Sequence, residues 1–132
     1  MKKLLAVIIM LIVLVASAQA ITTDAGFDYD AIAGYAHSHY GEVYTIVGRA
    51  VRIEEYHRSS DTTIVEEYTQ IAVDGDEDHI VCVHYTRPKN LTPMPIGSYV
   101  AIIAYVDGVQ RIDSVIIPLM EANSNPMILE EK

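Results

Sequence analysis

Short runs of apolar and β-branched residues, separated by turn residues, make up most of the chain. Residues 44–53 form the first run, with Gly48 in the middle, where a bulge or bend would let a strand curl. In residues 64–73, apolar and polar positions alternate with the two-residue period of a β-strand. Turn residues at 74–76 separate this run from the β-branched run 79–85, so we expect the two runs to pair as a hairpin.

Two more strands are predicted further along the chain. Prolines within residues 87–97 remove backbone donors and disfavour a helix, so this segment is predicted to be a crossing loop. Residues 98–106 are apolar on both faces, as expected for a strand that bends around a small barrel. The Asp-Gly pair at 107–108 is predicted to form a hairpin turn, followed by a fifth strand at 111–119 that stops near Pro118.

The two ends of the mature chain have weaker patterns. Within residues 21–43, apolar residues around Ile32 recur at helical spacing, which predicts a short helix. Asp30 is expected to cap the start of this helix, and Gly41 its end. Residues 120–132 end in charges and are expected to form a flexible tail.

The start of the chain has the pattern of an export signal. Lys2 and Lys3 precede an apolar run at 4–16, and the small residues within 17–20 offer a cleavage site. The apolar run is shorter than the roughly 20 residues that span a bilayer, so we expect cleavage after Ala20. An uncleaved signal would instead act as a membrane anchor. The mature chain is predicted to work outside the cytoplasm, in a secreted or periplasm-like location.

Composition narrows the possible partners and cofactors. The mature chain keeps all 18 Asp and Glu but seven of the nine Lys and Arg, which gives a net charge of −11. Such a surface repels phosphate backbones and anionic lipid, so nucleic acid is an unfavourable partner. Cys82 is the only cysteine, so the fold must rest on its core without an internal disulfide. No cofactor is expected.

The order of the predicted elements matches the OB-fold, an all-β Greek-key barrel of five strands, here with a short N-terminal helix. The segments 44–51, 80–83 and 96–108 resemble the "tRNA-anti-like" OB domains of exported proteins of largely unassigned function. This resemblance covers about residues 41–119 and implies a barrel at residues 44–119. The proline-rich connection departs from the family pattern, which often has a helix there. A two-layer sandwich would produce a similar hydrophobic pattern.

No nucleophile, base and orienting group occur together in the sequence, so we do not expect an enzyme. A metal site is an alternative hypothesis. Its candidate zinc or copper ligands are His37, His39, Cys82 and His84. The simpler interpretation is a solvated His37, a packed His39 and a buried thiol. Residues 74–78 resemble the start of a calcium loop but lack the glycine and carboxylate that an EF-hand needs further on.

The predicted interaction surface is the outer face of the second and third strands, with the adjoining loops. Its rings and guanidinium groups suit a saccharide or a protein partner. These residues are Tyr56, His57, Arg58, Tyr68, Tyr85 and Arg87. Alternatively, Tyr68 and Tyr85 only cover the surface of the hairpin and bind no partner. Asn90 begins a formal glycan acceptor sequence. The sequence therefore predicts an exported, non-catalytic OB-fold binding module; the alternatives are an extracytoplasmic metal-binding protein and, disfavoured by charge, a nucleic-acid binder.

Overall fold

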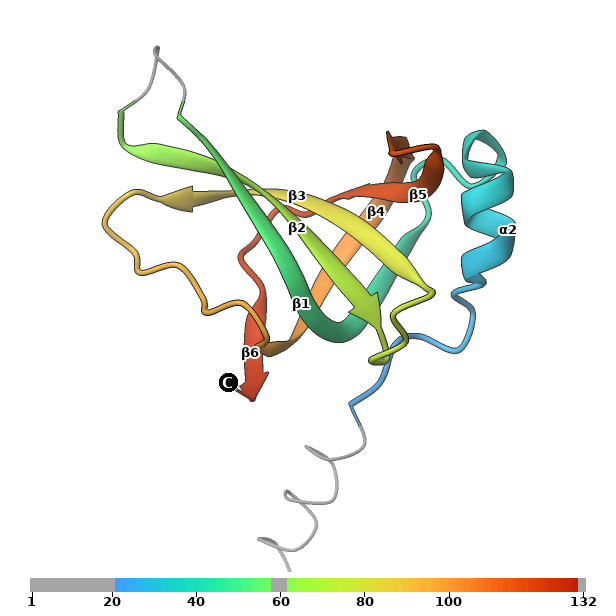
Figure 1. Ribbon diagram of the computed structural model, residues 1–132, viewed down its shortest axis with the longest axis horizontal. Helices are drawn as coiled ribbons and strands as arrows, with labels where there is room; N and C mark the ends of the chain where they lie inside the picture. Colours follow the sequence, from blue (N-terminus) through green and yellow to red (C-terminus); the bar gives the residue numbers. More distant parts are fainter. Residues whose placement is uncertain (1–20, 58–61, 131–132) are drawn as a thin grey trace, which may run out of the picture.

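A single β-sheet that closes on itself in a ring dominates the computed structural model, which describes residues 21–57 and 62–130 (Figure 1). The strands are β1 (Val43–His57), β2 (Ile64–Val73), β3 (Ile80–Pro88), β4 (Tyr99–Ile112), β5 (Val115–Glu121) and β6 (Met127–Glu130). Helix α2 (Tyr29–Gly34) and the 3-10 helix η1 (Ala36–Ser38) precede them. The predicted β-rich class is confirmed.

The strand order is β1-β2-β3-β5-β4-β6, and a further pairing of β1 with β4 closes the ring. All neighbours are antiparallel except β3 and β5, which run parallel. The predicted hairpin of β2 and β3 is confirmed, and its turn uses positive φ angles at Asp74 and Gly75. No helix within residues 21–57 and 62–130 is long and apolar enough to cross a membrane.

Strand β1 serves both halves of the ring because it bends. Its first half pairs with β4 and its second half with β2, and Gly48 belongs to both pairings. A Cβ on Gly48 would lie 2.0 Å from the carbonyl oxygen of Ala72, so the strands can approach this closely only at glycine. A register shift between Ala50 and Arg52 adds a bulge just beyond this point. The predicted curl at Gly48 agrees with this geometry.

Three strands run further than the sequence predicted. Strand β3 continues to Pro88, past its predicted end at Tyr85 and into the segment predicted to be a crossing loop. Strand β1 continues to His57, because its polar end pairs with β2 in a two-stranded arm. Strand β4 continues through the Asp-Gly pair at 107–108, so the prediction of a hairpin turn there was wrong. Gly108 instead lies at a bulge. The turn is formed by Asp113 and Ser114, which both adopt positive φ angles.

The predicted bounds of the fifth strand, 111–119, and the predicted tail were also wrong. Arg111 and Ile112 belong to β4, and β5 runs from Val115 to Glu121. Pro118 lies inside β5, where it pairs with Val109 of β4. Proline is tolerated at this position because β3 joins the other edge of β5 only from Leu119 onward. The chain then turns back, and β6 pairs with residues 99–101 of β4. Tail residues up to 130 are therefore held by the sheet.

The two ends of the ring are covered by different segments (Figure 1). Helix α2 covers one end and places the fully buried Ile32 in the core. Asp28, rather than the predicted Asp30, caps this helix, which ends well before Gly41. The connection between β3 and β4, whose residues are all described, contains no helix, and its Met94 packs against the core.

Candidate functional site

Strand alternation divides the predicted binding residues between two faces of the β2–β3 hairpin. Tyr56 and Tyr68 lie on the outer face and contact each other. Tyr85 and Arg87 lie on the inner face and are only 2% and 6% exposed, so they cannot share a surface with the first pair. His57 is exposed at the end of β1. The sixth predicted residue, at position 58, lies outside the described residues.

On the inner face, Arg87 is the centre of a buried polar cluster. Its Nε donates to Oε1 of Glu67 at 2.6 Å, and its Nη2 donates to Oε1 of Glu55 at 3.1 Å. Burial alone would lower the pKa of Arg87, but the hydrogen bond and charge of Glu67 and the nearby Glu55 raise it overall. Nη1 donates to the carbonyl oxygens of Pro88 and Leu91. Arg87 therefore fastens the β3–β4 connection to the sheet.

Sequence reasoning missed Glu67, which is 1% exposed. Its signal was present in the alternation of the strand: Glu67 shares the strand parity of Val65 and Thr69, and all three are buried. Close by, the Tyr85 hydroxyl and the Thr69 hydroxyl are 2.8 Å apart. Burial raises the pKa of Tyr85 well above its usual range. These contacts assign the inner cluster a structural role.

On the outer face, three rings form a ladder across neighbouring strands. The rings of Tyr56 and Tyr68 meet edge to face with centroids 5.3 Å apart, and the rings of Tyr68 and His84 are 4.5 Å apart. His84 Nδ1 is 2.7 Å from Glu121, and its Nε2 is 3.1 Å from Glu66. Both ring nitrogens of His84 are therefore engaged by carboxylates.

A cavity of about 140 Å³ lies beside the ladder and shares Tyr68 with it. It is lined by Arg52, Glu54, Tyr68, Gln70, Cys82, Gln110 and Ile112. These residues come from β1, β2, β3 and β4, so the cavity lies between the β1–β2 hairpin and the β4–β5 hairpin. Among the described residues, Oε1 of Gln110 is the one buried side-chain N or O atom without a hydrogen-bond partner. We call the ladder and this cavity together the outer-face site.

Carboxylates make the outer-face site electronegative. The Tyr56 hydroxyl donates to Glu54 at 3.1 Å, and this hydrogen bond raises the pKa of Tyr56. Burial, followed by the charges of Glu54 and Glu121, raises the pKa of the Cys82 thiol to about 12. The cation at the rim is Arg52, whose Nη2 is 2.6 Å from Glu54. The carboxylates of the site are thus paired with Arg52, with the Tyr56 hydroxyl and with His84.

The four candidate metal ligands are not brought together. Helix η1, which carries His37, packs against β4, whereas Cys82 and His84 belong to β3. His39 Nδ1 instead lies 2.5 Å from Oε1 of Glu42. Within residues 21–57 and 62–130, no group of three or more His, Cys, Asp or Glu side chains is placed to hold a metal ion.

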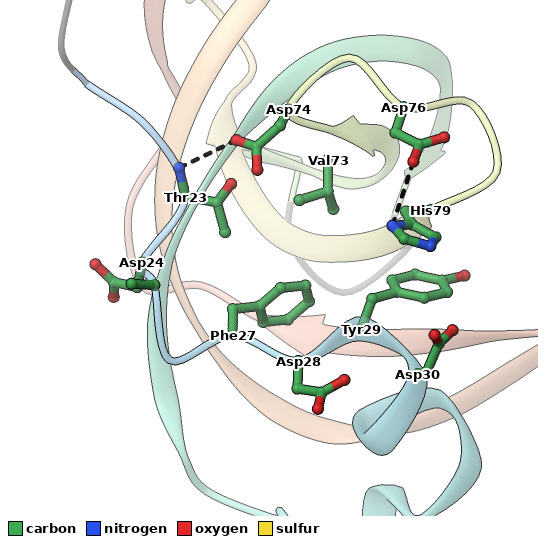
Figure 2. A pocket seen from close by; sticks show the side chains of 11 residues that line it. Thr23, Asp24, Phe27, Asp28, Tyr29, Asp30, Val73, Asp74, Asp76 and His79 are labelled. Carbon is green, nitrogen blue, oxygen red and sulfur yellow. Dashed lines mark hydrogen bonds and ion pairs between the residues drawn. The ribbon is translucent and has the colours of Figure 1, made fainter.

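A second, larger cavity of about 500 Å³ lies between the N-terminal segment and the β2–β3 turn (Figure 2). It contains the acidic turn that resembles a calcium loop. Oδ1 of Asp74 accepts a hydrogen bond from the backbone of Thr23 at 3.2 Å, and Asp76 pairs with His79 at 3.4 Å. The Tyr29 ring stacks on His79 at 4.5 Å. Asp74 and His79 of the turn thus hold the N-terminal segment against the sheet.

Sequence reasoning did not identify four residues of the outer-face site as binding groups. These residues are Glu54, Gln70, His84 and Gln110. Their side chains meet only through the pairing of β1 with β2 and of β2 with β3, together with the close approach of the β4–β5 hairpin. No local sequence signal carries that information.

The chain was compared with known proteins, and no family model, no curated protein and no solved structure matches it.

Proposed function

We propose that this chain is an exported, non-catalytic binding module that recognises a protein or saccharide partner at the outer-face site. The observation that carries the proposal is the ring ladder of Tyr56, Tyr68 and His84 beside a small polar cavity. Adjacent rings offer flat apolar area, and the neighbouring amides and carboxylates offer directional hydrogen bonds. This combination suits recognition of a partner.

The proposal includes an OB-fold-like Greek-key barrel related to the tRNA-anti-like domains. The ring order β1-β2-β3-β5-β4, closed by the pairing of β1 with β4, supports it. OB-folds bind ligands on the outer face of strands two and three, between the loops that follow strands one and four. The outer-face site occupies the equivalent place. The proline-rich connection remains a departure from the family pattern.

Two features favour binding over catalysis. The Cys82 thiol, with its pKa of about 12, stays protonated at physiological pH and is a poor nucleophile. Both ring nitrogens of His84 already face carboxylates, which leaves neither available as a general base. The mature charge of −11 also opposes nucleic acid as the partner.

Export and binding are tested on one preparation. The full chain is expressed in a host with export machinery and recovered from the extracytoplasmic fraction, where N-terminal sequencing is expected to begin at Ile21. Glycan arrays and binding assays with candidate exported proteins are then run on the wild type and on the double variant Tyr56→Ala/Tyr68→Ala. The matched control is Tyr35→Ala/Tyr40→Ala, which removes two tyrosines that are 65% and 67% exposed elsewhere on the surface.

We expect the Tyr56/Tyr68 variant to lose binding and the control to keep it, with thermal unfolding confirming that both variants fold. Binding that is unchanged in the Tyr56/Tyr68 variant would remove the outer-face site from the proposal. Turnover of any substrate by the purified wild type would contradict the non-catalytic assignment.

A further inference from the structure

Along the first half of strand β1, both edges have hydrogen-bond partners. One edge pairs with β4, and the N-terminal segment covers the other. The amide of Thr45 donates to Oδ2 of Asp24 at 2.7 Å, and the amide of Asp24 donates to the carbonyl oxygen of Thr45 at 3.0 Å. The Thr23 hydroxyl accepts from the amide of Val47 at 2.9 Å and donates to its carbonyl oxygen at 3.0 Å. The backbone groups of Thr45 and Val47 that point away from β4 therefore have partners.

The second half of β1 has no such cover. Strand β4 pairs with β1 only as far as Arg49, and Ala50 exchanges backbone hydrogen bonds with Gly97 and Ser98. Residues 52–57 pair with β2 on one side, and among the described residues no strand or backbone hydrogen bond joins their other side. Every second residue of an antiparallel strand points its N–H and C=O groups away from its partner strand. We call this side of residues 52–57 the open edge.

Burial shows that the open edge lies at the surface. The side chain of Glu55 is 37% exposed, whereas that of Glu67, its partner across the pairing of β1 with β2, is 2% exposed. Tyr56 and His57 are also exposed. Figure 1 shows the far ends of β1 and β2 projecting together away from α2. A partner can therefore reach the backbone of the open edge from solvent.

The open edge has the form of a template for a further strand. Past the bulge between Ala50 and Arg52, its register with β2 is regular from Arg52 to His57. It contains no proline and no lysine, two residue types with which proteins block exposed edges. Its length is that of a common strand, about 5–6 residues. An extended peptide could therefore bind along it through backbone hydrogen bonds.

Charge opposes a second copy of this chain as the occupant. Glu54 and Glu55 lie at the middle of the open edge. Antiparallel pairing of two copies about this middle would place Glu54 of one copy opposite Glu55 of the other, and like charges directly opposite each other destabilise a sheet. The mature net charge of −11 adds repulsion between copies. The open edge therefore favours a strand of another protein with neutral or basic side chains.

The outer-face site lies directly beside the open edge, because both use β1. Tyr56 belongs to the open edge, and its ring is the first of the ladder, with its centroid 5.3 Å from that of Tyr68. Directly opposed residues of antiparallel strands have Cβ atoms about 4.5–5.5 Å apart. A strand added along β1 would therefore place one of its side chains against the Tyr56 ring. Backbone pairing and ring contact would then act on the same partner.

We infer that an extended segment of a partner protein adds to the sheet as a strand along the open edge of β1 and contacts the Tyr56 ring. This inference rests on the proposed binding function and names the partner as a protein rather than a saccharide. The backbone N–H and C=O groups of the segment pair with the outward groups of residues 52–57, which supplies affinity. Its side chains alternate between the two faces, and those on the outer face contact the ladder, which supplies selectivity.

Amide hydrogen exchange, followed by NMR on the exported protein, tests whether a peptide pairs with the open edge. The probe is a short peptide of alternating threonine and valine, with a central tyrosine and a lysine at each end. Without the probe, we expect every second amide of residues 52–57 to exchange fast. With saturating probe, we expect these amides to exchange about tenfold more slowly. The amides of Thr45 and Val47, already bonded to the N-terminal segment, are the internal control and are expected not to change.

Chemical variants of the probe separate backbone pairing from side-chain contact. N-methylation of one peptide bond at a time removes a single backbone donor. We expect binding to weaken about tenfold at every second position and little at the positions between, because alternate donors face β1. Replacing both lysines by glutamates is expected to weaken binding about fivefold through charge repulsion. Replacing the central tyrosine by alanine is expected to weaken it about threefold.

Two results would overturn the inference. The first is that exchange in residues 52–57 is not slowed by the probe, or that N-methylation has equal effects at neighbouring positions. The second is a dimer in sedimentation analysis whose open-edge amides are protected without the probe, because the edge would then join two copies of this chain.

The variant Tyr56→Ala/Tyr68→Ala distinguishes this inference from the proposed function. We expect it to bind the probe about fivefold or more weakly than the wild type does. If another ligand binds through these tyrosines without strand addition, the binding module stands and the inference is overturned. If the alternating effect of N-methylation persists unchanged in the tyrosine variant, strand addition is supported, but the outer-face site and the contact with Tyr56 are removed. If the probe does not bind and no partner depends on these tyrosines, both proposals fail.

Discussion

Glu66 and Glu67 are neighbours in β2, yet they belong to regions of opposite character. Glu67 faces inward and is 1% exposed, and its carboxylate is bound by Arg87. Glu66 faces outward, where it contacts His84 at the edge of the ring ladder. In the inner cluster, Arg87 is 6% exposed and binds both carboxylates, while the side chain of Glu55 at its edge is 37% exposed and a cavity of about 180 Å³ lies against Glu67, Tyr85 and Arg87. The outer-face site uses similar residues, but there the carboxylates pair with the exposed cation Arg52 and with His84, beside a cavity of about 140 Å³. Similar residues thus form a buried ion-paired cluster on one face and, on the other, the more exposed site where we propose recognition.

The strongest way to break this comparison is to remove the inner cation. Arg87→Met leaves the carboxylates of Glu67 and Glu55 without their partner, and we expect unfolding to become easier by about 3–5 kcal/mol. Urea denaturation measures this change. The matched variant Arg52→Met removes an exposed cation on the outer face and is expected to cost at most about 1 kcal/mol. Similar losses in the two variants would contradict the distinction.

Unfolding at alkaline pH tests the comparison between the two faces at Cys82, which lies on the outer face. In the folded protein, burial and then the charges of Glu54 and Glu121 raise the pKa of Cys82 from 9.0 to about 12. The unfolded thiol ionises first, so the stabilisation is complete below pH 9 and is lost as the pH rises toward 12. We expect Cys82→Ala to remove a pH dependence of up to about 1.4 kcal/mol per pH unit in this window. Urea denaturation between pH 8 and 11, compared with the wild type, measures the difference. If the free energy of unfolding changed with pH by the same slope in the wild type and in Cys82→Ala, the result would argue against the raised pKa of Cys82.

The hydroxyls of two tyrosines provide a finer test. Tyr85→Phe removes a buried hydroxyl bonded to Thr69 and is expected to cost about 1–2 kcal/mol. Tyr56→Phe removes a hydroxyl from a residue that is 51% exposed, so its cost is expected to be below about 0.5 kcal/mol. Thermal unfolding of both variants gives the comparison. A larger loss in Tyr56→Phe would reverse the roles assigned to the two faces.

The smallest expected effect concerns the carboxylates around His84. Glu121→Gln keeps an acceptor near Nδ1 of His84 but removes one negative charge from a partly exposed pair. We expect the free energy of unfolding to change by less than about 1 kcal/mol. Chemical denaturation at neutral pH measures it. A loss as large as that expected for Arg87→Met would show that the ladder is part of the core.

Local patterns predicted the features that depend on neighbouring residues. Gly48 marked the bend of β1, and the turn at 74–76 marked the β2–β3 hairpin. The β4–β5 turn was misplaced because Asp107 and Gly108 have the ordinary signature of a hairpin turn, whereas Asp113 and Ser114 form it. Pairing along the strands decides between such positions, and Val106 and Met120 pair as buried partners across the hairpin. That register is a long-range property.

The candidate site was predictable only in part for the same reason. Tyr56 and Tyr68 were assigned to one surface, and they do meet. Tyr85 and Arg87 were expected beside them, but their strand parity turns them into the core. Gln110 lies far from β2 in sequence and lines the cavity only because the β4–β5 hairpin folds toward it. No period within a single strand reveals such a neighbour.

The last strand changes which backbone groups lie at the edge of the sheet. Strand β6 covers the edge of β4 at residues 99–101, which would otherwise present unpaired backbone groups. Uncovered edges of this kind recruit strands from other molecules and promote aggregation. Strand β6, Met127–Glu130, therefore pairs these groups and leaves a four-residue strand as the edge of the sheet on that side, and very short edge strands are one of the ways in which proteins limit such pairing.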